Sequence, residues 1–392
     1  MRILYIHQYF KTPKEGGAIR SWYIASAMAN AGHDIQLVTA HNENKYIVKN
    51  IDGINVHYLP VNYKNSYGFF RRLLSFLKFA HRAYYFSRKI PSIDFAYISS
   101  TPLTVGLVAL KLFQKNHIRY VFEVRDLWPE APIKMGIIQN PILKYVSRYL
   151  EKKVYQKANK LVALSPGIEQ YIKGFRIKVP VHLCPNMSDC NFFSIELPED
   201  KLLIDQFGLK RKFIISYFGS IGRSNALDYL LNIALISAKE DCDIVFFIIG
   251  DGAMKKKLVK RSIASGLNNI HFIDHLNKFE LKKYLSITDA TYISFANYSV
   301  LENNSPNKFF DSLASGKLVI SNTGGWIREL IENYSCGFYY HPEEPQMFID
   351  QIKPFLKDQN LVMKAKKNAR ELALKRFERQ KLTMELFNFL EI

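Results

Sequence analysis

Short apolar runs alternate with amphipathic helical stretches along almost the whole chain, and this alternation constrains the fold more than any other feature. The runs typical of strands form two series: 2–6, 35–39, 54–59, 95–98, 120–124, 161–164 and 181–184, then 213–218, 244–249, 270–273, 290–294 and 318–321. Helical spacing of apolar residues fills most of the gaps between them. Repeated strand–helix–strand units form parallel sheets covered by helices. The sequence therefore predicts two doubly wound, Rossmann-like α/β domains.

The alternation stops between residues 185 and 211, where prolines, an Asp-Cys-Asn turn and a polar stretch replace it. A chain of 392 residues also exceeds the usual size of one domain. We place a linker near residues 186–200. The predicted organisation is a first domain over 1–190, a second over 200–370, and a C-terminal segment over 371–392 whose helix, 371–390, crosses back to the first domain. Ligands of open α/β sheets lie beyond the carboxyl ends of the strands, which predicts a site in the cleft between the domains.

Composition and the first residues favour a cytoplasmic globular protein. Hydrophobic residues make up 48% of the chain and charged residues 23%, as in folded domains. No apolar run approaches the roughly 20 residues that span a bilayer. The start, MRILYIHQYF, lacks the long apolar region and cleavage site of a signal peptide. The four cysteines show no CxxC or metal-ligand spacing, which predicts reduced thiols.

The net charge of +19 favours an anionic partner, such as a nucleic acid, a phospholipid surface or a phosphorylated substrate. A lysine-rich genome is the alternative explanation. The stretch YGFFRRLLSFLKFAHRAYYFSRKI, residues 67–90, concentrates positive charge on an amphipathic helix without any acidic residue. Such a helix either lies in an anionic membrane interface or packs on the sheet with its basic face in water. The sequence leaves both interpretations open.

Three glycine turns follow predicted strands. They contain Gly16 and Gly17, then Gly219, then Gly250, and Arg223 follows the second turn closely. Glycine allows the backbone to approach a phosphate, a helix N-terminus adds partial positive charge, and arginine offers a fork for diphosphate oxygens. Each turn alone is weak evidence, because any strand–helix turn favours glycine. The chain contains neither a Walker A motif nor a complete GxGxxG, which disfavours a P-loop NTPase or a simple NAD-binding domain.

The stretch SPNKFFDSLASGKLVISNTGG, residues 305–325, places a lysine and an acid at helical spacing before a strand. Lys308 lies near the predicted helix start, where a cation opposes the helix dipole. Its position is favourable if an anion binds there. Asp311, one turn further, can accept hydrogen bonds from a ribose diol. An ordinary surface ion pair between the two residues is the alternative.

Several ordered motifs resemble those of one family along nearly the whole chain. They are HQYFKTPKEGGAIRSW, RDLWPEAP, LVALSPGI, YFGSIGRSNALDYLL and NSPNKFFDSLASGKLVI. The chain resembles the family 4 glycosyltransferases, which have the GT-B fold of two facing Rossmann-like domains with an interdomain cleft. Within that family it is similar to bacterial surface-polysaccharide enzymes of the N-acetylfucosaminyl transferase type.

This resemblance implies roles for individual residues. Gly16 and Gly17 would approach the donor phosphate, with Gly219 and Gly250 in the phosphate-binding turns. Arg223 and Lys308 would bind the diphosphate, and Asp311 would hold the ribose. Ile273, with the turn of Asp274 and His275, would present backbone to the base. Asn303 replaces the family's first glutamate, so Asn304 or Glu302 is an alternative contact to the sugar. Arg125-Asp126 replaces a frequent histidine–aspartate pair, and the expected catalytic residues are Arg223, Lys308 and Asp126.

The implied reaction is a retaining transfer of a sugar, an N-acetylhexosamine by analogy, from a UDP-sugar to an acceptor hydroxyl. The main difficulty is charge developing on the leaving diphosphate, which fixed cations and amides stabilise. The DxD string at 241–243 begins a predicted strand, opposite the expected site, so we interpret it as a turn. We therefore expect no metal and no cofactor. The resemblance also implies a polyprenyl-diphosphate-linked saccharide acceptor and a peripheral position, through residues 67–90, on the inner face of the cell membrane.

Two other functions compete with this interpretation. A nucleic-acid-binding protein would explain the charge and the aromatic residues. However, the sequence contains no recognition module, so we expect no nucleic acid partner; a salt-dependent mobility shift would discriminate. A nonhydrolytic UDP-sugar epimerase also has two facing α/β domains, and it would convert UDP-sugar without an acceptor.

Overall fold

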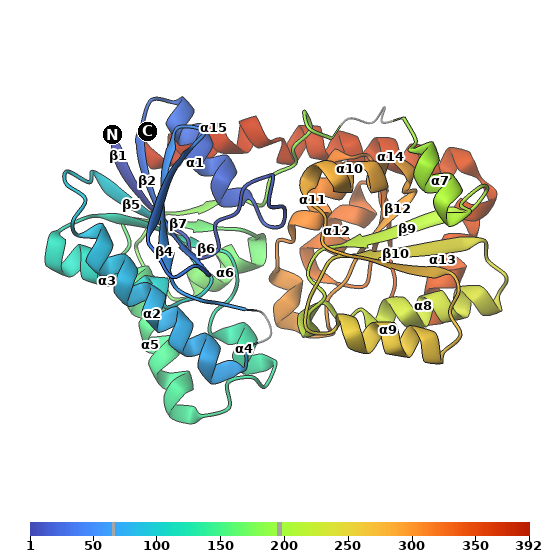
Figure 1. Ribbon diagram of the computed structural model, residues 1–392, viewed down its shortest axis with the longest axis horizontal. Helices are drawn as coiled ribbons and strands as arrows, with labels where there is room; N and C mark the ends of the chain where they lie inside the picture. Colours follow the sequence, from blue (N-terminus) through green and yellow to red (C-terminus); the bar gives the residue numbers. More distant parts are fainter. Residues whose placement is uncertain (65–66, 194–197) are drawn as a thin grey trace.

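The computed structural model describes residues 1–64, 67–193 and 198–392. The linker predicted near 186–200 therefore lies partly outside the described residues. Two lobes lie side by side, each with a twisted sheet between helices (Figure 1). The predicted architecture of two parallel α/β domains is confirmed.

The first lobe contains an eight-stranded sheet in the order β3-β4-β2-β1-β5-β6-β7-β8. All neighbours are parallel except β3 and β4. The order reverses between β1 and β5, which creates a crevice at the carboxyl ends of these strands. The strands are β1 (Arg2–Ile6), β2 (Asp34–His41), β3 (Ile47–Ile51), β4 (Ile54–Pro60), β5 (Phe95–Ser99), β6 (Tyr120–Val124), β7 (Lys160–Ala163) and β8 (Val181–Leu183).

Helices cover this sheet, and α3 contacts both α2 and α5. The helices are α1 (Arg20–Asn30), α2 (Phe69–Ser87), α3 (Val105–Asn116), α4 (Glu130–Lys134), α5 (Pro141–Lys157) and α6 (Pro166–Gly174).

The second lobe contains a six-stranded, wholly parallel sheet in the order β11-β10-β9-β12-β13-β14, which reverses between β9 and β12. The strands are β9 (Phe213–Phe218), β10 (Ile244–Ile249), β11 (Ile270–Ile273), β12 (Ala290–Ile293), β13 (Leu318–Ser321) and β14 (Gly337–Tyr339). The helices are α7 (Lys201–Phe207), α8 (Asp228–Lys239), α9 (Lys255–Ala264), α10 (Lys278–Ile287), α11 (Asn307–Ala314), α12 (Gly325–Asn333), α13 (Pro345–Lys357), α14 (Gln359–Leu372) and α15 (Arg379–Leu390), with short turns η1 (Arg223–Asn225) and η2 (Ser299–Asn303).

Each strand predicted from the sequence is present, because central strands buried on both faces require continuous apolar runs. Strands β9 and β10, with the sequences FIISYF and IVFFII, are buried at every position. The edge strand β3 was missed, since its sequence IVKNI is mostly exposed and carries little pattern.

The C-terminal helix predicted over 371–390 is divided in the structure. A π-helical turn, Ala373–Phe377, follows α14, and α15 begins only at Arg379. The reason is a tertiary contact: the backbone N–H of Ser188 donates to the carbonyl of Phe377 at 2.7 Å, and that of Arg379 donates to Ser188 at 3.1 Å. The linker backbone thus takes hydrogen bonds that a continuous helix would make itself.

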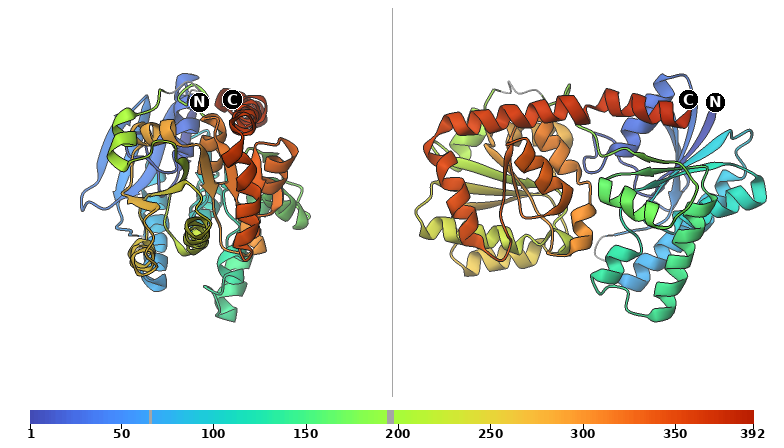
Figure 2. Two further views of the ribbon diagram at one scale, coloured as in Figure 1. Left: turned by 90° about the vertical axis from the view of Figure 1, so that its right-hand side faces the viewer. Right: turned by 180° about the vertical axis from the view of Figure 1, so that it is seen from behind.

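After this break α15 crosses to the first lobe, as the red helix shows in Figure 2. Lys160 Nζ, at the start of β7, donates to the carbonyl of Phe389 at 2.6 Å. The ring of Phe389 stacks on His182 of β8, with centroids 4.9 Å apart. The chain therefore passes between the lobes at the linker and again before α15.

A buried ion pair fixes the segment that follows β8 within the first lobe. The Arg20 guanidinium lies 2.9 Å from Glu123 Oε1, and both side chains are almost fully buried. It also donates to the carbonyls of Cys184 at 2.9 Å and Pro185 at 2.5 Å. Burial alone would raise the pKa of Glu123, but Arg20 and Arg125 lower it to about 2. The charge on Glu123 therefore depends on its arginine neighbours.

We predict that Arg20→Met lowers the free energy of unfolding by about 3–5 kcal/mol, because it leaves a buried carboxylate without its partner. Urea denaturation measures the change. The matched control is Arg328→Met, which removes an exposed pair with Glu332 four residues away and should cost less than about 0.5 kcal/mol. Equal effects of the two substitutions would contradict the assignment.

Candidate active site

The glycine turn after β1 reaches the second lobe. A Cβ on Gly16 would lie 2.8 Å from the carbonyl oxygen of Leu276 and 3.1 Å from Asn277 Cα, and its φ is +69°. His275 Nε2 donates to the carbonyl of Glu15 at 3.0 Å. Gly17 has a φ of +84°, and a Cβ added there would meet no heavy atom within 4 Å among the described residues. The turn therefore touches the other lobe through Gly16 and borders open space at Gly17.

The glycines after β9 and β10 pack against each other. A Cβ on Gly250 would lie 2.0 Å from the carbonyl oxygen of Gly219. The Gly219 N–H donates to Ile249 and the Gly250 N–H donates to Ile273, both at 3.0 Å. Their amides are thus already engaged, and the two glycines contribute close packing of the loops rather than free donors.

Lys308, near the start of α11, lies beside the β9 loop. Its Nζ donates to Tyr217 Oη at 2.9 Å and to Asn225 Oδ1 at 3.1 Å. A Cβ on Gly219 would be 3.4 Å from Lys308 Cε. Within the described part of the chain no carboxylate pairs with this lysine. Burial lowers its pKa to about 7. Lys308 is therefore a desolvated amine held by neutral groups only.

Arg223 begins η1 directly after the β9 loop, and its side chain is exposed. Its guanidinium makes no hydrogen bond or ion pair with any residue that the structure describes. Two residues further along the chain, Asn225 accepts from Lys308. The loop after β9 therefore carries the exposed Arg223 guanidinium and the Asn225 amide oxygen that accepts from Lys308 of α11.

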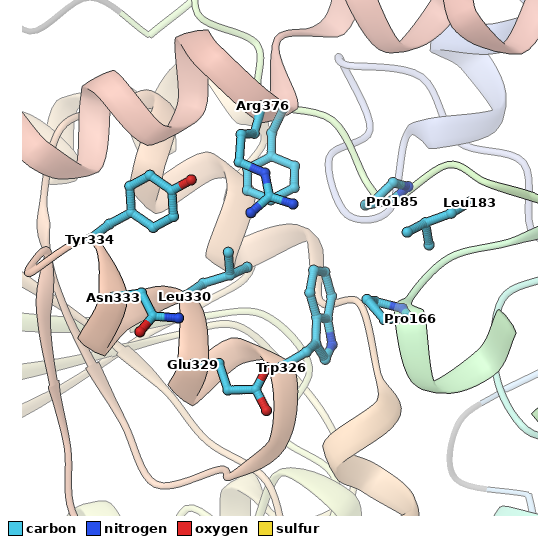
Figure 3. Close-up of a pocket in the computed structure, with 10 residues that line it drawn as sticks. Pro166, Leu183, Pro185, Trp326, Glu329, Leu330, Asn333, Tyr334 and Arg376 are labelled. Atoms are coloured by element: carbon cyan, nitrogen blue, oxygen red, sulfur yellow. The ribbon is translucent and has the colours of Figure 1, made fainter. Parts of the chain in front are cut away.

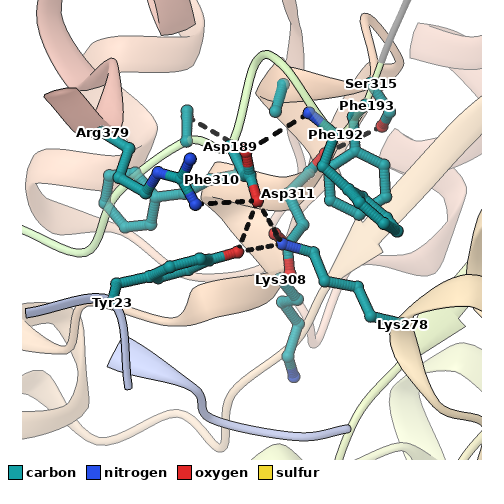
Figure 4. Close-up of polar contacts among 12 residues, drawn as sticks. Tyr23, Asp189, Phe192, Phe193, Lys278, Lys308, Phe310, Asp311, Ser315 and Arg379 are labelled. Carbon is teal, nitrogen blue, oxygen red and sulfur yellow. Dashed lines mark hydrogen bonds and ion pairs between the residues drawn. The ribbon is translucent and has the colours of Figure 1, made fainter. Parts of the chain in front are cut away.

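Asp311 lies in a cluster that joins both lobes (Figure 4). Lys278 Nζ is 4.0 Å from Asp311 Oδ1 and 3.1 Å from Asp189 Oδ2. Tyr23 Oη donates to Asp189 at 2.7 Å, and Arg379 lies 3.4 Å from the same carboxylate. Burial and Asp189 raise the pKa of Asp311 to about 6, against the effect of Lys278. The Asp311 side chain is 22% exposed, so it remains partly accessible.

Lys308 and Asp311, both on α11, thus contact different partners. Figure 4 shows the Lys308 amine extending away from the cluster that contains Asp311. Their separation excludes the simple ion pair that their spacing allowed. It leaves each free to contact a different part of one ligand.

Lys255 connects the loops after β10 and β11. Its Nζ donates to the carbonyls of Gly250 at 3.0 Å and Ile273 at 3.2 Å, and to Asp274 Oδ1 at 2.6 Å. The hydrogen bond from Lys255 lowers the pKa of the exposed Asp274. The Asp274–His275 turn is therefore fixed beside Gly16.

Asn303 contacts the first lobe, whereas Asn304 contacts α12 of its own lobe. The Asn303 carbonyl accepts from Ser165 Oγ at 2.5 Å, and a Cβ on Gly167 would lie 1.7 Å from Asn303 Oδ1. The carbonyl of Asn304 accepts from Trp326 Nε1 at 2.9 Å. Asn303 also borders an interdomain hollow of about 360 Å³, lined by Leu127, Glu130, Lys134, Gly167, Gln170, Tyr171, Ser299, Val300 and Asn303.

Asp126 lies after β6 in the first lobe, where Thr101 Oγ1 donates to it at 3.0 Å. The preceding Arg125 lies 3.2 Å from His7 Nε2, and Ser21 Oγ lies 2.9 Å from His7 Nδ1. Burial, reinforced by Arg125, holds the pKa of His7 well below its usual value. A neutral His7 that accepts from Arg125 on Nε2 carries its proton on Nδ1.

Gly219 lies between Gly250 and Lys308, and Arg223 follows in the same loop. Asp126 contacts none of these residues within the described chain, because it belongs to the opposite lobe. Sequence reasoning missed the partners that position the site: Tyr23, Asp189, Asn225, Lys255 and Lys278. Only Lys278 carried a local signal, since it follows the helix-capping residue Asn277.

A second hollow, of about 160 Å³, lies where the chain crosses between the lobes (Figure 3). Its lining includes Pro185 just before the predicted linker, Trp326 of α12 and Phe377 before α15. None of the residues predicted for donor binding lines it, so it is separate from the candidate site. The DxD string lies at the amino end of β10, where Asp243 pairs with Lys212 at 2.5 Å.

Two family models match the chain, one for each lobe. A "Glycosyl transferase 4-like domain" matches residues 15–187, and "Glycosyl transferases group 1" matches residues 200–372. A search of curated protein sequences finds no match.

Solved structures share the fold over the full length. Sucrose-phosphate synthase from Thermosynechococcus elongatus has a TM-score of 0.77 at 16% identity, covering 100% of this chain and 98% of its own. HepE from Anabaena, in complex with UDP-glucose, has a TM-score of 0.74 at 16% identity, with coverage of 100% and 99%. An E. coli trehalose-6-phosphate protein bound to UDP-2-fluoro glucose has a TM-score of 0.76 at 10% identity, with the same coverage. With both lobes matched in this order, the chain belongs to the family 4 glycosyltransferases of GT-B fold.

Proposed function

We propose that the protein is a retaining, metal-independent glycosyltransferase that uses a UDP-sugar donor and a polyprenyl-diphosphate-linked saccharide acceptor. The observation that carries the proposal is the pair of unneutralised cationic side chains, Lys308 and Arg223, beside the packed loops after β9 and β10. The desolvated Lys308 amine, which has no carboxylate partner in the described chain, is costly to protonate unless a ligand compensates the charge. A diphosphate supplies that compensation.

In this arrangement the UDP moiety lies along the carboxyl edge of the second sheet. Arg223 and Lys308 bind the diphosphate, and Asp311 accepts hydrogen bonds from the ribose. The backbone at Ile273 and Asp274 faces the base. Gly17 completes the phosphate side from the first lobe, because the space beside it is open. The complexes of HepE with UDP-glucose support the choice of donor class.

The chemical step builds negative charge on the leaving diphosphate. Each fixed donor aimed at this charge contributes about 3–4 kcal/mol to the barrier reduction. Asn303, at the interdomain hollow, contacts the transferred sugar, with Asn304 or Glu302 as the alternative. Asp126, from the first lobe, acts on the acceptor hydroxyl. The transferred sugar is an N-acetylhexosamine, and the product belongs to a bacterial surface polysaccharide such as an O-antigen or capsule.

We place the enzyme in the cytoplasm, peripherally on the inner face of the cell membrane. None of the helices within the described residues has the length and apolarity to cross a bilayer. Helix α2 combines both interpretations of residues 67–90: Phe79 is fully buried, whereas Phe70 is 78% and Leu74 is 67% exposed. One face of α2 thus packs in the lobe while another remains available to lipid headgroups.

Replacing either cation should reduce turnover. We predict that Lys308→Met or Arg223→Met lowers kcat/KM by about two orders of magnitude or more. The measurement is the steady-state transfer rate of purified variants with unchanged thermal midpoints. Lys357→Met, which removes an exposed charge at the end of α13, is the control and should retain full activity. Wild-type kinetics in both site variants would refute the assignment.

The affinity for the donor should fall both above pH 7 and below pH 6. Above pH 7 the free Lys308 amine loses its proton, so diphosphate binding must recruit one, and affinity for UDP-N-acetylglucosamine falls as pH rises. Below pH 6 protonated Asp311 no longer accepts freely from ribose, so affinity falls again. Calorimetry at about pH 8 in buffers of different ionisation enthalpy should show proton uptake in the wild type and not in Lys308→Met. A pH-independent affinity from about pH 6 to 8.5 would contradict this.

We predict full activity in EDTA, because arginine and lysine supply the positive charge that Mg²⁺ supplies elsewhere. Transfer rates with and without added Mg²⁺ after chelation measure this. A strict requirement for a divalent cation would overturn the metal-independent mechanism.

A further inference from the structure

The first half of α5 has its apolar residues on the outside. Ile142 and Tyr145 are each 72% exposed, Val146 is 53% and Tyr149 is 55% exposed. Their spacing of three, four and seven residues places them on one helix face. The preceding Ile137 is 52% exposed as well. A helix that only covers a sheet has the reverse arrangement, with its apolar face inward. We call the residues Ile142, Tyr145, Val146 and Tyr149 the α5 stripe.

Basic side chains surround the α5 stripe. Lys144, Arg148, Lys152 and Lys153 belong to the same helix, and Lys153 Nζ lies 5.4 Å from the centre of the Tyr149 ring. The one acidic residue of α5, Glu151, is buried and accepts from Tyr155 and Tyr171 at 3.1 Å each. It therefore presents no carboxylate to the outside. The outer surface of α5 is apolar, aromatic and positively charged.

The α5 stripe lies at an extremity of the molecule. The first turns of α5 form the lowest part of the first lobe in the views of Figures 1 and 2. Helix α3 separates α5 from α2, whose Phe70 and Leu74 are also exposed. Within the described residues, no neighbouring element covers these side chains. A flat partner below the lobe would contact α5 first.

An ion pair connects α5 to the hollow between the lobes. Arg148 Nη2 donates to Glu130 Oε2 of α4 at 2.9 Å, and Lys134 lies 3.8 Å from the same carboxyl group. Glu130 and Lys134 line the interdomain hollow together with Asn303. A surface bound beneath α5 would therefore lie next to the interdomain hollow that Asn303 borders.

We propose that the α5 stripe is the main docking surface for an anionic lipid bilayer. Tyrosines are favourable at the headgroup level because they combine an apolar ring with a polar hydroxyl. Isoleucine and valine bury apolar area just below it, and the surrounding lysines and arginines attract anionic lipids. Charge complementarity selects the bilayer over a second copy of this chain, whose α5 would repel equally. The inference extends the membrane contact in the proposed function but does not depend on the transfer reaction.

The test is flotation of the full chain with phosphatidylcholine vesicles, with and without phosphatidylglycerol. The wild type should float with the anionic vesicles and much less with the neutral ones. The double variant Tyr145→Ser, Tyr149→Ser should lose at least about tenfold in partitioning. Ile263→Ser is the matched control, because Ile263 is 75% exposed on α9 of the other lobe; it should float like the wild type.

Three results would overturn the proposal. The first is wild-type flotation by the double variant, most clearly if Phe70→Ser abolishes flotation. The second is equal binding to neutral and anionic vesicles. The third is a wild-type dimer in sedimentation that the double variant converts to monomer, which would assign the stripe to a second copy. Calorimetric binding of UDP-N-acetylglucosamine should be unchanged in the double variant. Flotation without any transferase activity would reject the proposed function and leave this inference intact.

Discussion

The relative position of the two lobes depends on one buried carboxylate. Asp189 of the linker receives hydrogen bonds or ion pairs from Tyr23 of α1, Lys278 of α10 and Arg379 of α15. Burial alone would raise its pKa, but Lys278 and Arg379 lower it below the usual range. A buried charge is tolerated only when several donors satisfy it. Asp189 therefore requires segments from both lobes and from both chain crossings to meet at one point.

The contacts of Asp189 also help to position the candidate site. Lys278 lies between Asp189 and Asp311, so the residue assigned to the ribose is tied to the residue that fixes the lobes. Two glycines show how closely the lobes then approach: Gly16 meets the 276–277 backbone, and Gly167 meets Asn303. A side chain at Gly16 would push against backbone of the other lobe, and a side chain at Gly167 would displace the Asn303 side chain. The proposed donor contacts from one lobe and acceptor contacts from the other would thus depend on the same interface.

The sequence predicted the features that depend only on residues close to one another in the chain. Buried strands such as β10 are continuous apolar runs, and the predicted position of Lys308 at a helix start before a strand is confirmed. The edge strand β3 lacks such a run, and the break before α15 arises from Ser188, far away in the chain. The cluster of Tyr23, Asp189 and Lys278 could not be predicted either, because nothing local relates residues so distant in sequence. Tertiary contacts decided each of these cases.

The two residues of α11 that we assign to the donor, Lys308 and Asp311, have pKa values shifted in opposite directions. Burial lowers the pKa of Lys308 and raises that of Asp311, so both groups ionise close to neutral pH. Without a ligand, each charge is held at a cost in solvation. In the proposed complex, a diphosphate at Lys308 would stabilise the ammonium, and ribose hydroxyls at Asp311 would stabilise the carboxylate. Binding energy would then come from groups that the fold has desolvated in advance, which is the condition under which fixed charges act strongly on a reacting centre.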